Sequence, residues 1–536
     1  MFGMPRRIAA LLAAATLVPL AGCGSSGSGS SGSGADPAKV VPADAAAYIE
    51  AVVRPDGDVK SGAEDALKKL LRTDDPSGKI TGLLNKSLSK KGTSWDDVKQ
   101  WLGSRAGAFL SGVENGKPIA AAVIDITDKD KASAALGKKL TSKSNYKGVE
   151  VSSDGKHSLA FLDDYAVIGT DTGVKQVIDT SQGRQPLSDM ADYNSMRSTL
   201  KADDALGIAY AQPQRILDLL QKALPAVQSS GTPGASQFAN PQVLQVLRQA
   251  IGRLGRAAGI ALHANGDAVR VDGAGLGNTT PDNPAGADAV AALPDDAWLA
   301  IGFGDLGGTL RKFVNQFSQL SKMSAAASGG ALPSGAVPNL GAMLGGGKSG
   351  INIKRDLLSW MGSGAIYARG HSLLDIGAVL TVQTKDPAKS RRAVKLIGNA
   401  LRKSGHQAVP TTVPGYDTAI KVKLSDQLPV SLIIAANNER MSIGINPQAL
   451  ADVQAPPKKF GDSDAYANAT KSLGGDLRPI FVLDFPSVVN LLQGFGLSNN
   501  PSFAKIKPYL DTLGEISIGT AHDGDVARFA LAVGLR

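Results

Sequence analysis

The sequence has one cysteine among its 536 residues, Cys23, and this scarcity sets the first limits. A disulfide framework and a zinc site built from several thiolates are excluded, because each needs at least two cysteines. The five histidines lie more than five residues apart, and H-E-x-x-H does not occur, so no local metal pair is expected. Aromatic residues make up only 5% of the chain, which leaves much of the packing to alanine, glycine and valine.

A strong charge imbalance is also missing. The formal net charge is +9, and it becomes +7 if Arg6 and Arg7 are removed with an N-terminal segment that holds no acidic residue. Over about 500 residues this excess mainly favours solubility, with attraction to an anionic membrane as the alternative. The basic runs at 138–147 and 391–395 lack the repeated aromatics of a stacking platform, so no nucleic-acid partner is expected.

The N-terminus has the pattern of an export signal. Arg6 and Arg7 precede an apolar run, Ile8 to Leu20, which is too short to span a membrane as a helix and has the length of a signal-peptide core. The run ends in Leu-Ala-Gly-Cys, which resembles the bacterial lipobox. This resemblance implies a signal peptide over 1–22 and a mature N-terminus at Cys23, modified there by diacylglyceryl and palmitate-type acyl chains.

A flexible tether follows the predicted lipidation site. Residues 24–34 are all Gly or Ser, a composition that cannot bury apolar surface. With the residues up to 39, it forms a tether whose r.m.s. reach is on the order of 20 Å. We therefore expect an extracytoplasmic protein, lipid-anchored at the cell membrane, with no further span because no later run approaches eighteen apolar residues.

The rest of the chain reads as one pattern repeated twice. Val41-Pro-Ala-Asp matches Leu293-Pro-Asp-Asp, the stretch around Trp101 matches that around Trp360, and each copy closes with an N-G or D-G hairpin. The matches keep their order along the chain. They predict a first repeat over 40–277, a linker over 278–288 and a second repeat over 289–536.

The order of elements in each repeat predicts the fold class. Strands joined by tight turns favour antiparallel pairing. We expect an α+β protein of two tandem related domains, each a curved, mainly antiparallel sheet with helices packed on one face. Asp386-Pro387 is a typical helix start, and Trp101 and Trp360 are expected on apolar helix faces in the core.

Motifs that suggest enzyme chemistry fail on inspection. Gly302-Phe-Gly304-Asp-Leu-Gly307 fits a dinucleotide pattern but lacks the acidic residue about twenty positions on, and copy one has no counterpart. Gly347-Lys348-Ser349 lacks the correctly spaced first glycine of a phosphate loop. No G-x-S-x-G occurs, and the paired aspartates sit at turns and helix starts. We expect no enzymatic activity, no cofactor, no metal and no catalytic residues.

The opening V-P-A-D-A-A-A-Y-I-E and the later W-L-G-S-R-A-G-A-F, behind the lipobox and tether, resemble an actinobacterial envelope family known as domain of unknown function 3352. The resemblance implies a secreted or membrane-tethered α+β protein and assigns no activity. We expect a binding module for a hydrophobic or envelope ligand. The alternative is a structural or protein-interaction lipoprotein of the envelope, with lipid or an envelope protein as partner.

One segment is a candidate contact surface. Residues 324–347 carry no charge but keep large apolar side chains, which cost free energy in water. They are expected either to pack on their own domain or to meet a lipid, ligand or partner. The candidate apolar contact residues are Leu332, Val337, Leu340, Met343 and Leu344.

Overall fold

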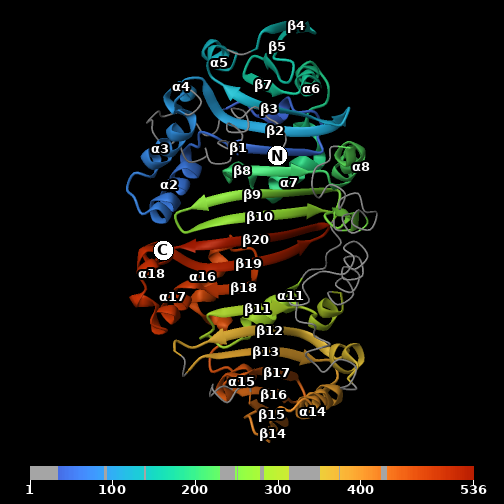
Figure 1. Ribbon diagram of the computed structural model, residues 1–536, viewed down its shortest axis with the longest axis vertical. Helices are drawn as coiled ribbons and strands as arrows, with labels where there is room; N and C mark the ends of the chain where they lie inside the picture. The colour runs from blue at the N-terminus through green and yellow to red at the C-terminus, as the bar shows by residue number, and fades with distance from the viewer. Residues whose placement is uncertain are drawn as a thin grey trace. The chain divides into compact units, whose positions relative to one another are not determined.

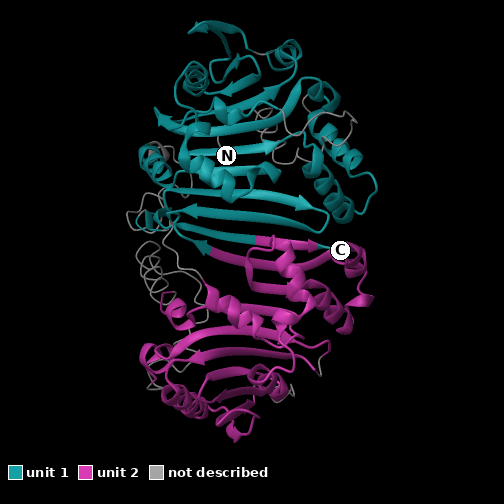
Figure 2. Ribbon diagram, turned by 180° about the vertical axis from the view of Figure 1, so that it is seen from behind, with its two compact units in different colours: residues 1–281, 522–530, 535 teal, residues 282–521, 531–534, 536 magenta. Residues whose placement is uncertain are grey.

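A computed structural model describes residues 34–89, 93–137, 140–229, 245, 248–249, 251–277, 283–312, 351–372, 375–423 and 431–536. The chain divides into two compact units, and Figure 2 shows them in different colours. Unit 1 holds residues 1–281, 522–530 and 535, and unit 2 holds residues 282–521, 531–534 and 536. Both units combine helices with antiparallel strands, so the predicted α+β class and antiparallel sheet are confirmed.

The strands of unit 1 pair in the order β4-β5-β6-β7-β3-β2-β1-β8-β9-β10 among the described residues. Their bounds are β1 Ala47–Val52, β2 Leu102–Glu114, β3 Lys117–Ile126, β4 Ser142–Tyr146, β5 Val149–Ser153, β6 Ser158–Phe161, β7 Tyr165–Gly169, β8 Gly207–Ala211, β9 Ala257–Asn265 and β10 Ala268–Leu276. The helices are α2 Gly57–Leu71, α3 Pro76–Ser89, α4 Trp95–Lys99, α5 Lys129–Leu136, α6 Asp171–Ser181, α7 Ala191–Thr199 and α8 Pro213–Ser229, with short turns η2 Pro37–Lys39, η3 Leu187–Asp189 and η4 Ala202–Asp204.

The later strands pair in the order β14-β15-β16-β17-β13-β12-β11-β18-β19-β20 within the described part of the chain. Their bounds are β11 Leu299–Phe303, β12 Met361–Arg369, β13 Gly377–Thr384, β14 Ala408–Thr411, β15 Thr418–Lys423, β16 Ser431–Ala436, β17 Arg440–Ile445, β18 Arg478–Asp484, β19 Leu513–Asp523 and β20 Val526–Leu535. The helices are α11 Pro284–Ala291, α14 Pro387–Lys403, α15 Pro447–Gln454, α16 Asp464–Ser472, α17 Phe485–Gly494 and α18 Pro501–Leu510, with η5 Ile353–Leu358, η6 Phe460–Asp462 and η7 Leu497–Asn499. Each strand thus has a counterpart ten numbers later at the same place in the order (Figure 1).

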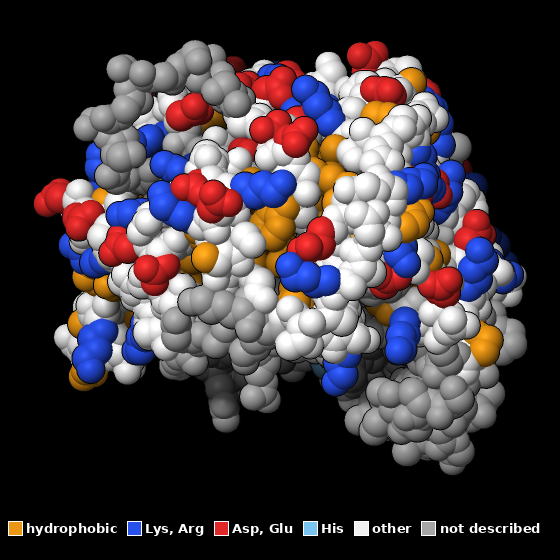
Figure 3. Space-filling view, turned by 90° about the horizontal axis from the view of Figure 1, so that it is seen from above, with side chains coloured by type: hydrophobic (Ala, Val, Ile, Leu, Met, Phe, Trp, Pro, Cys, Tyr) orange, Lys and Arg blue, Asp and Glu red, His pale blue; other side chains and the backbone are white. Residues whose placement is uncertain are grey.

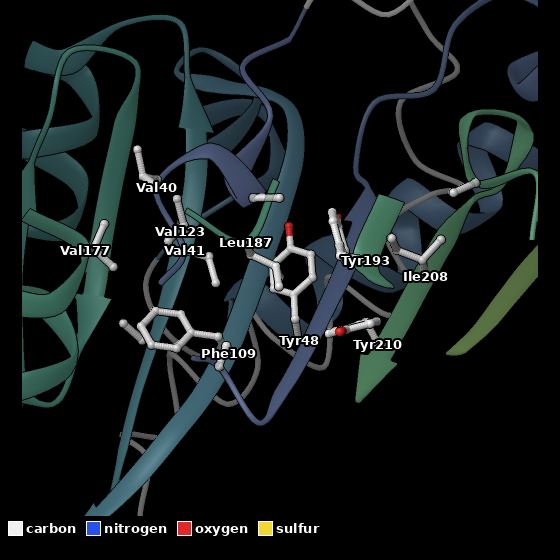
Figure 4. Close-up of a cluster of buried hydrophobic side chains, with 14 of the residues drawn as sticks. Val40, Val41, Tyr48, Phe109, Val123, Val177, Leu187, Tyr193, Ile208 and Tyr210 are labelled. Carbon is white, nitrogen blue, oxygen red and sulfur yellow. The ribbon is translucent and has the colours of Figure 1, made fainter. Parts of the chain in front are cut away.

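Alternating strand positions define two faces of the unit 1 sheet. We call face A the side that carries Tyr48 and Phe109, and face B the side that carries Ile49 and Ala108. Face A packs against α6 and α7, and Figure 4 shows the centre of this core. Face B packs, over β2, β3, β6 and β7 and at Ala51 of β1, against α2 to α5. The expectation placed the helices on one face, whereas in unit 1 they cover both.

The structure confirms the hairpin turn and the helix start that the sequence predicts at Asn265-Gly266 and Asp386-Pro387. Asn265-Gly266-Asp267 joins β9 to β10, and the Asn265 side chain accepts hydrogen bonds from the next turn amides. The Asp386 side chain caps α14 by accepting a hydrogen bond of 3.1 Å from the Lys389 amide. Trp101 and Trp360 are buried as expected, but they lie just after α4 and η5, where each chain turns into a strand, rather than on a helix face.

Candidate functional site

Several predicted features lie outside the described residues. Cys23 and the signal peptide over 1–22 are among them, as is most of the tether. The candidate contact residues Leu332, Val337, Leu340, Met343 and Leu344 lie outside them too. The described part of the chain offers a different apolar surface.

This surface is a strip on face B of unit 1. The apolar strip consists of Ile49 on β1, Ala209 on β8, Ile260 and Leu262 on β9, and Val271 on β10. The register places Ile49 opposite Ala209, Ala209 opposite Ile260, and Leu262 opposite Val271, so the side chains adjoin across four strands. Ile49, Ile260 and Leu262 are 45%, 47% and 36% exposed. These fractions are high for large apolar side chains in the middle of a sheet.

No polar side chain points to face B from β1, β8, β9 or β10. The remaining positions on that side of these strands are all alanine, glycine or valine: Ala47, Ala51, Gly207, Ala211, Ala258, Ala264, Val269, Gly273 and Gly275. Ala209 between Ile49 and Ile260 is small, and the Phe529 ring of unit 1 covers Gly273 on the β10 side. These positions offer no side-chain donor or acceptor. Such a surface offers apolar contact and no side-chain hydrogen-bonding group.

Two helices lie at opposite ends of the strands that form the strip. Figure 1 shows α2 at one end of β1, β8 and β9, and α8 at the other. The contact with α2 is close: a side chain on Gly62 would meet the Ala264 carbonyl at 2.8 Å, and the Lys69 ammonium donates to the Gly266 carbonyl at 2.5 Å. The middle of the strip keeps the exposed fractions given above.

Face A beneath the strip carries a buried ionic cluster. The Glu50 side chain is 4% exposed and forms an ion pair of 2.7 Å with Arg105 and a longer one of 3.9 Å with Arg197. The Tyr48 hydroxyl donates to Glu50 at 2.8 Å. Tyr193 packs edge-on against Tyr48 and lies beneath the Arg197 guanidinium. Every charged group in this cluster has a partner, as a buried charge requires.

The cluster shifts the ionisation of its tyrosines. Burial, followed by the nearby negative charge of Glu50, raises the pKa of Tyr48 well above its ordinary value. Burial and Glu50 likewise raise the pKa of Tyr193, which the Arg197 guanidinium partly opposes. Burial is also the main cause that raises the pKa of Tyr210 to about 12. Neutral tyrosines are therefore part of the folded state.

The end of the tether is fastened beside this cluster. The Asp125 carboxylate accepts a hydrogen bond of 2.7 Å from the Ser104 amide, and the Ala35 amide also donates to it. Burial raises the pKa of Asp125, against the effect of these amide donors. The Tyr165 hydroxyl donates to the Asp36 carbonyl at 2.9 Å. These hydrogen bonds attach Ala35 and Asp36, which directly follow the Gly/Ser run, to the sheet of unit 1.

The dinucleotide-like glycines of the second repeat have a packing role. A side chain on Gly302 would collide with the Gly286 carbonyl of α11, and one on Gly304 would collide with Asn283. A side chain on Gly307 would meet the Leu358 carbonyl at 2.5 Å. These glycines let α11 and the segment before β12 approach the backbone, so they do not form an open phosphate-binding loop.

His263 belongs to a partly buried ionic group in unit 1. His263 lies 3.2 Å from Asp272, which also pairs with Arg270, and its ring contacts the Leu200 carbonyl. Burial lowers the pKa of His263, against the pull of Asp272. No group of three or more His, Cys, Asp or Glu side chains is placed to hold a metal ion among the residues the structure describes. No helix within those residues is long and apolar enough to cross a membrane.

Sequence reasoning missed the strip, although a signal for it exists. In the β1 sequence, Ile49 stands between Tyr48 and Glu50, so large side chains alternate to both faces. In β9 the sequence Gly-Ile-Ala-Leu-His puts its two largest residues on the face opposite His263. Strands that are apolar on both faces need cover on both faces. Here the structure provides full cover on one of them.

These features define an antiparallel α+β protein of two compact units with an exposed apolar sheet face. The chain matches the profile of the family described as "Protein of unknown function (DUF3352)" over residues 8–533, and it belongs to that family. No curated protein matches it.

Three solved structures of TP0453 show a distant likeness. Crystal forms IV, III and I share 10%, 9% and 11% sequence identity with this chain, at TM-scores of 0.24, 0.25 and 0.24. The alignments cover 45%, 47% and 47% of this chain and 80%, 84% and 82% of TP0453. TM-scores this low support no conclusion about function.

Proposed function

We propose that this protein is a membrane-tethered, extracytoplasmic lipoprotein that binds the hydrocarbon chain of a lipid on the apolar strip of unit 1. The observation that carries the proposal is the exposure of Ile49, Ile260 and Leu262 on the part of face B formed by β1, β8, β9 and β10, which has no polar side chains. Covering the exposed parts of these three side chains would contribute about 1 kcal/mol each. The lipobox-like sequence before Cys23 supports the anchoring, and the protein acts by binding rather than by catalysis.

A binding assay with a fluorescent sixteen-carbon fatty acid tests the strip. Two charges at Ile49→Asp and Ile260→Asp should weaken binding by about 3 kcal/mol or roughly 100-fold, because they remove apolar contact and place carboxylates under the chain. The matched control is Leu83→Asp on α3, since Leu83 is 67% exposed and lies off the strip. Equal affinity of the strip variant and the control would refute lipid binding here and would favour the structural or protein-interaction role.

A second variant separates shape from charge. Ala209→Trp keeps the strip apolar but raises its floor between Ile49 and Ile260. We expect it to weaken fatty-acid binding while leaving the circular dichroism spectrum unchanged. Undiminished binding would mean that the probe does not lie on this floor.

The anchoring is tested separately by fractionation of cells. With Cys23→Ser, the protein should appear in the medium or remain unprocessed, because the acylated thiol is removed. A matured variant that stays in the membrane fraction through a salt wash would contradict anchoring at Cys23.

A further inference from the structure

A second exposed apolar surface lies in unit 2. Residues 485–504 form a run of twenty without a charged side chain, and they make up α17, η7 and the start of α18. Val489, Leu491 and Phe503 are buried and attach these helices to the unit. The run therefore has buried side chains of its own in unit 2.

Large apolar residues of these helices are nevertheless exposed. Phe495, at the end of α17, is 38% exposed, and Ile506 and Tyr509 on α18 are each 52% exposed. Ile506 and Tyr509 are three positions apart, so they share one helix face. We call Phe495, Ile506 and Tyr509 the apolar tip. An aromatic ring with a hydroxyl beside aliphatic side chains suits the boundary between water and hydrocarbon.

Two lysines and one aspartate lie next to the tip in the sequence. Lys505 and Lys507 flank Ile506 in the sequence, and Lys505 is exposed. The nearest acidic residue after them, Asp511, pairs with Lys507 at 2.6 Å. Lysines next to exposed apolar residues can reach phosphate groups while their stems lie along the acyl boundary. Elsewhere the charges are mixed: the face in Figure 3 shows acidic and basic side chains interspersed.

We propose that the apolar tip docks on an anionic phospholipid surface, with Phe495, Ile506 and Tyr509 at the acyl boundary and Lys505 at the headgroups. The uncharged run, the exposed side chains and the adjacent lysines together fit the surface of a membrane better than a protein partner, because an interfacial element combines an apolar edge with basic flanks. This contact is separate from the apolar strip of unit 1 and does not depend on what the strip binds.

The single native cysteine makes a local test straightforward. In the full chain with Cys23→Ser, Ile506→Cys provides one thiol for an environment-sensitive nitrobenzoxadiazole label. The matched control is Leu83→Cys in the same background, because Leu83 is also highly exposed but lies on α3. Both labelled proteins are mixed with phosphatidylcholine vesicles that contain or lack phosphatidylglycerol.

We expect the emission of the label at 506 to shift to shorter wavelength with phosphatidylglycerol vesicles and to be quenched by nitroxide-labelled acyl chains. The label at 83 should remain in water, and Lys505→Glu should weaken the shift at 506. A label at 506 that stays in water, or that responds no more than the label at 83, would overturn the proposal. Variants of the apolar strip should leave the signal at 506 unchanged, so this result and the fatty-acid assay fail independently.

Discussion

The buried ion pairs around Glu50 allow a quantitative test of what holds unit 1 together. Glu50→Ala removes the partner that lies 2.7 Å from Arg105 and the acceptor of the Tyr48 hydroxyl. Removing one member of a buried pair costs about 3–5 kcal/mol, because the other charge stays in the interior without compensation. Arg105 and Arg197 are 16% and 17% exposed, so water can partly solvate them, and the lower end of this range applies.

Differential scanning calorimetry measures the effect as a shift in melting temperature. For a unit of about 250 residues, a loss of about 3 kcal/mol lowers Tm by roughly 6–12 °C. The control is Glu150→Ala, which breaks the pair with Lys143, in which both side chains are more than 60% exposed. Surface pairs of this kind contribute about 0–1 kcal/mol. If Glu50→Ala lowered Tm no more than Glu150→Ala, the cluster would not stabilise unit 1.

A combined variant distinguishes two origins of the loss. Replacing Glu50, Arg105 and Arg197 together by methionine or leucine removes the charges along with the cost of burying them. Such replacements are often neutral or stabilising when packing is kept. We therefore expect the triple variant to recover most of the stability that Glu50→Ala loses. A triple variant less stable than Glu50→Ala would show that the attraction between the charges outweighs their desolvation.

Two further outcomes are expected. The folded pKa values of Tyr48 and Tyr193 lie above the ordinary value near 10, so the stability that these tyrosines contribute is complete below pH 10 and is lost as the pH rises above it. The absorbance of these two tyrosines at 295 nm should therefore change together with unfolding, and their reversible titration near pH 10 in the folded protein would contradict this. Gly302→Ala should lower the Tm of unit 2, because the added Cβ would collide with the Gly286 carbonyl. The control Gly82→Ala lies in α3, where no atom is within 4 Å of the added Cβ, and should leave the chain equally or more stable; equal shifts in Tm for the two variants would refute the packing role of Gly302.

Local features of the fold were predictable because local physics determines them. Asn265-Gly266 predicted the β9–β10 turn, since glycine next to asparagine suits the backbone of a tight hairpin. Asp386-Pro387 predicted the start of α14 for an equally local reason. The tryptophans were assigned correctly to the core but wrongly to helices. At Trp101 and Trp360 a short helix ends and a strand begins within one or two residues, and element boundaries are not marked by apolar periodicity.

The two candidate surfaces were less accessible to sequence reasoning because exposure depends on long-range packing. Ile49 and Val123 are both apolar strand residues, yet Ile49 is 45% exposed and Val123 is fully buried. Only the placement of the helices decides between them. The partners of Glu50 pose the same difficulty, since Arg105 and Arg197 are 55 and 147 positions further along the chain. No spacing rule links positions that far apart.

The corresponding strands β1 and β11 show how one sheet position can be used in two ways. Matching Val41-Pro42 with Leu293-Pro294 aligns Glu50 with Gly302, and the isolated bridges formed by the two prolines support this alignment. At this position β1 places a carboxylate that binds two arginines on face A. At the equivalent position β11 has no side chain, and the backbone of α11 fills the space. The shared strand order is therefore compatible with different cover on face A, and the ionic cluster is a property of the first repeat. Because face A is filled in both cases, the large apolar side chains that stay exposed on β1 and β9, among the described residues of the first repeat, lie on face B.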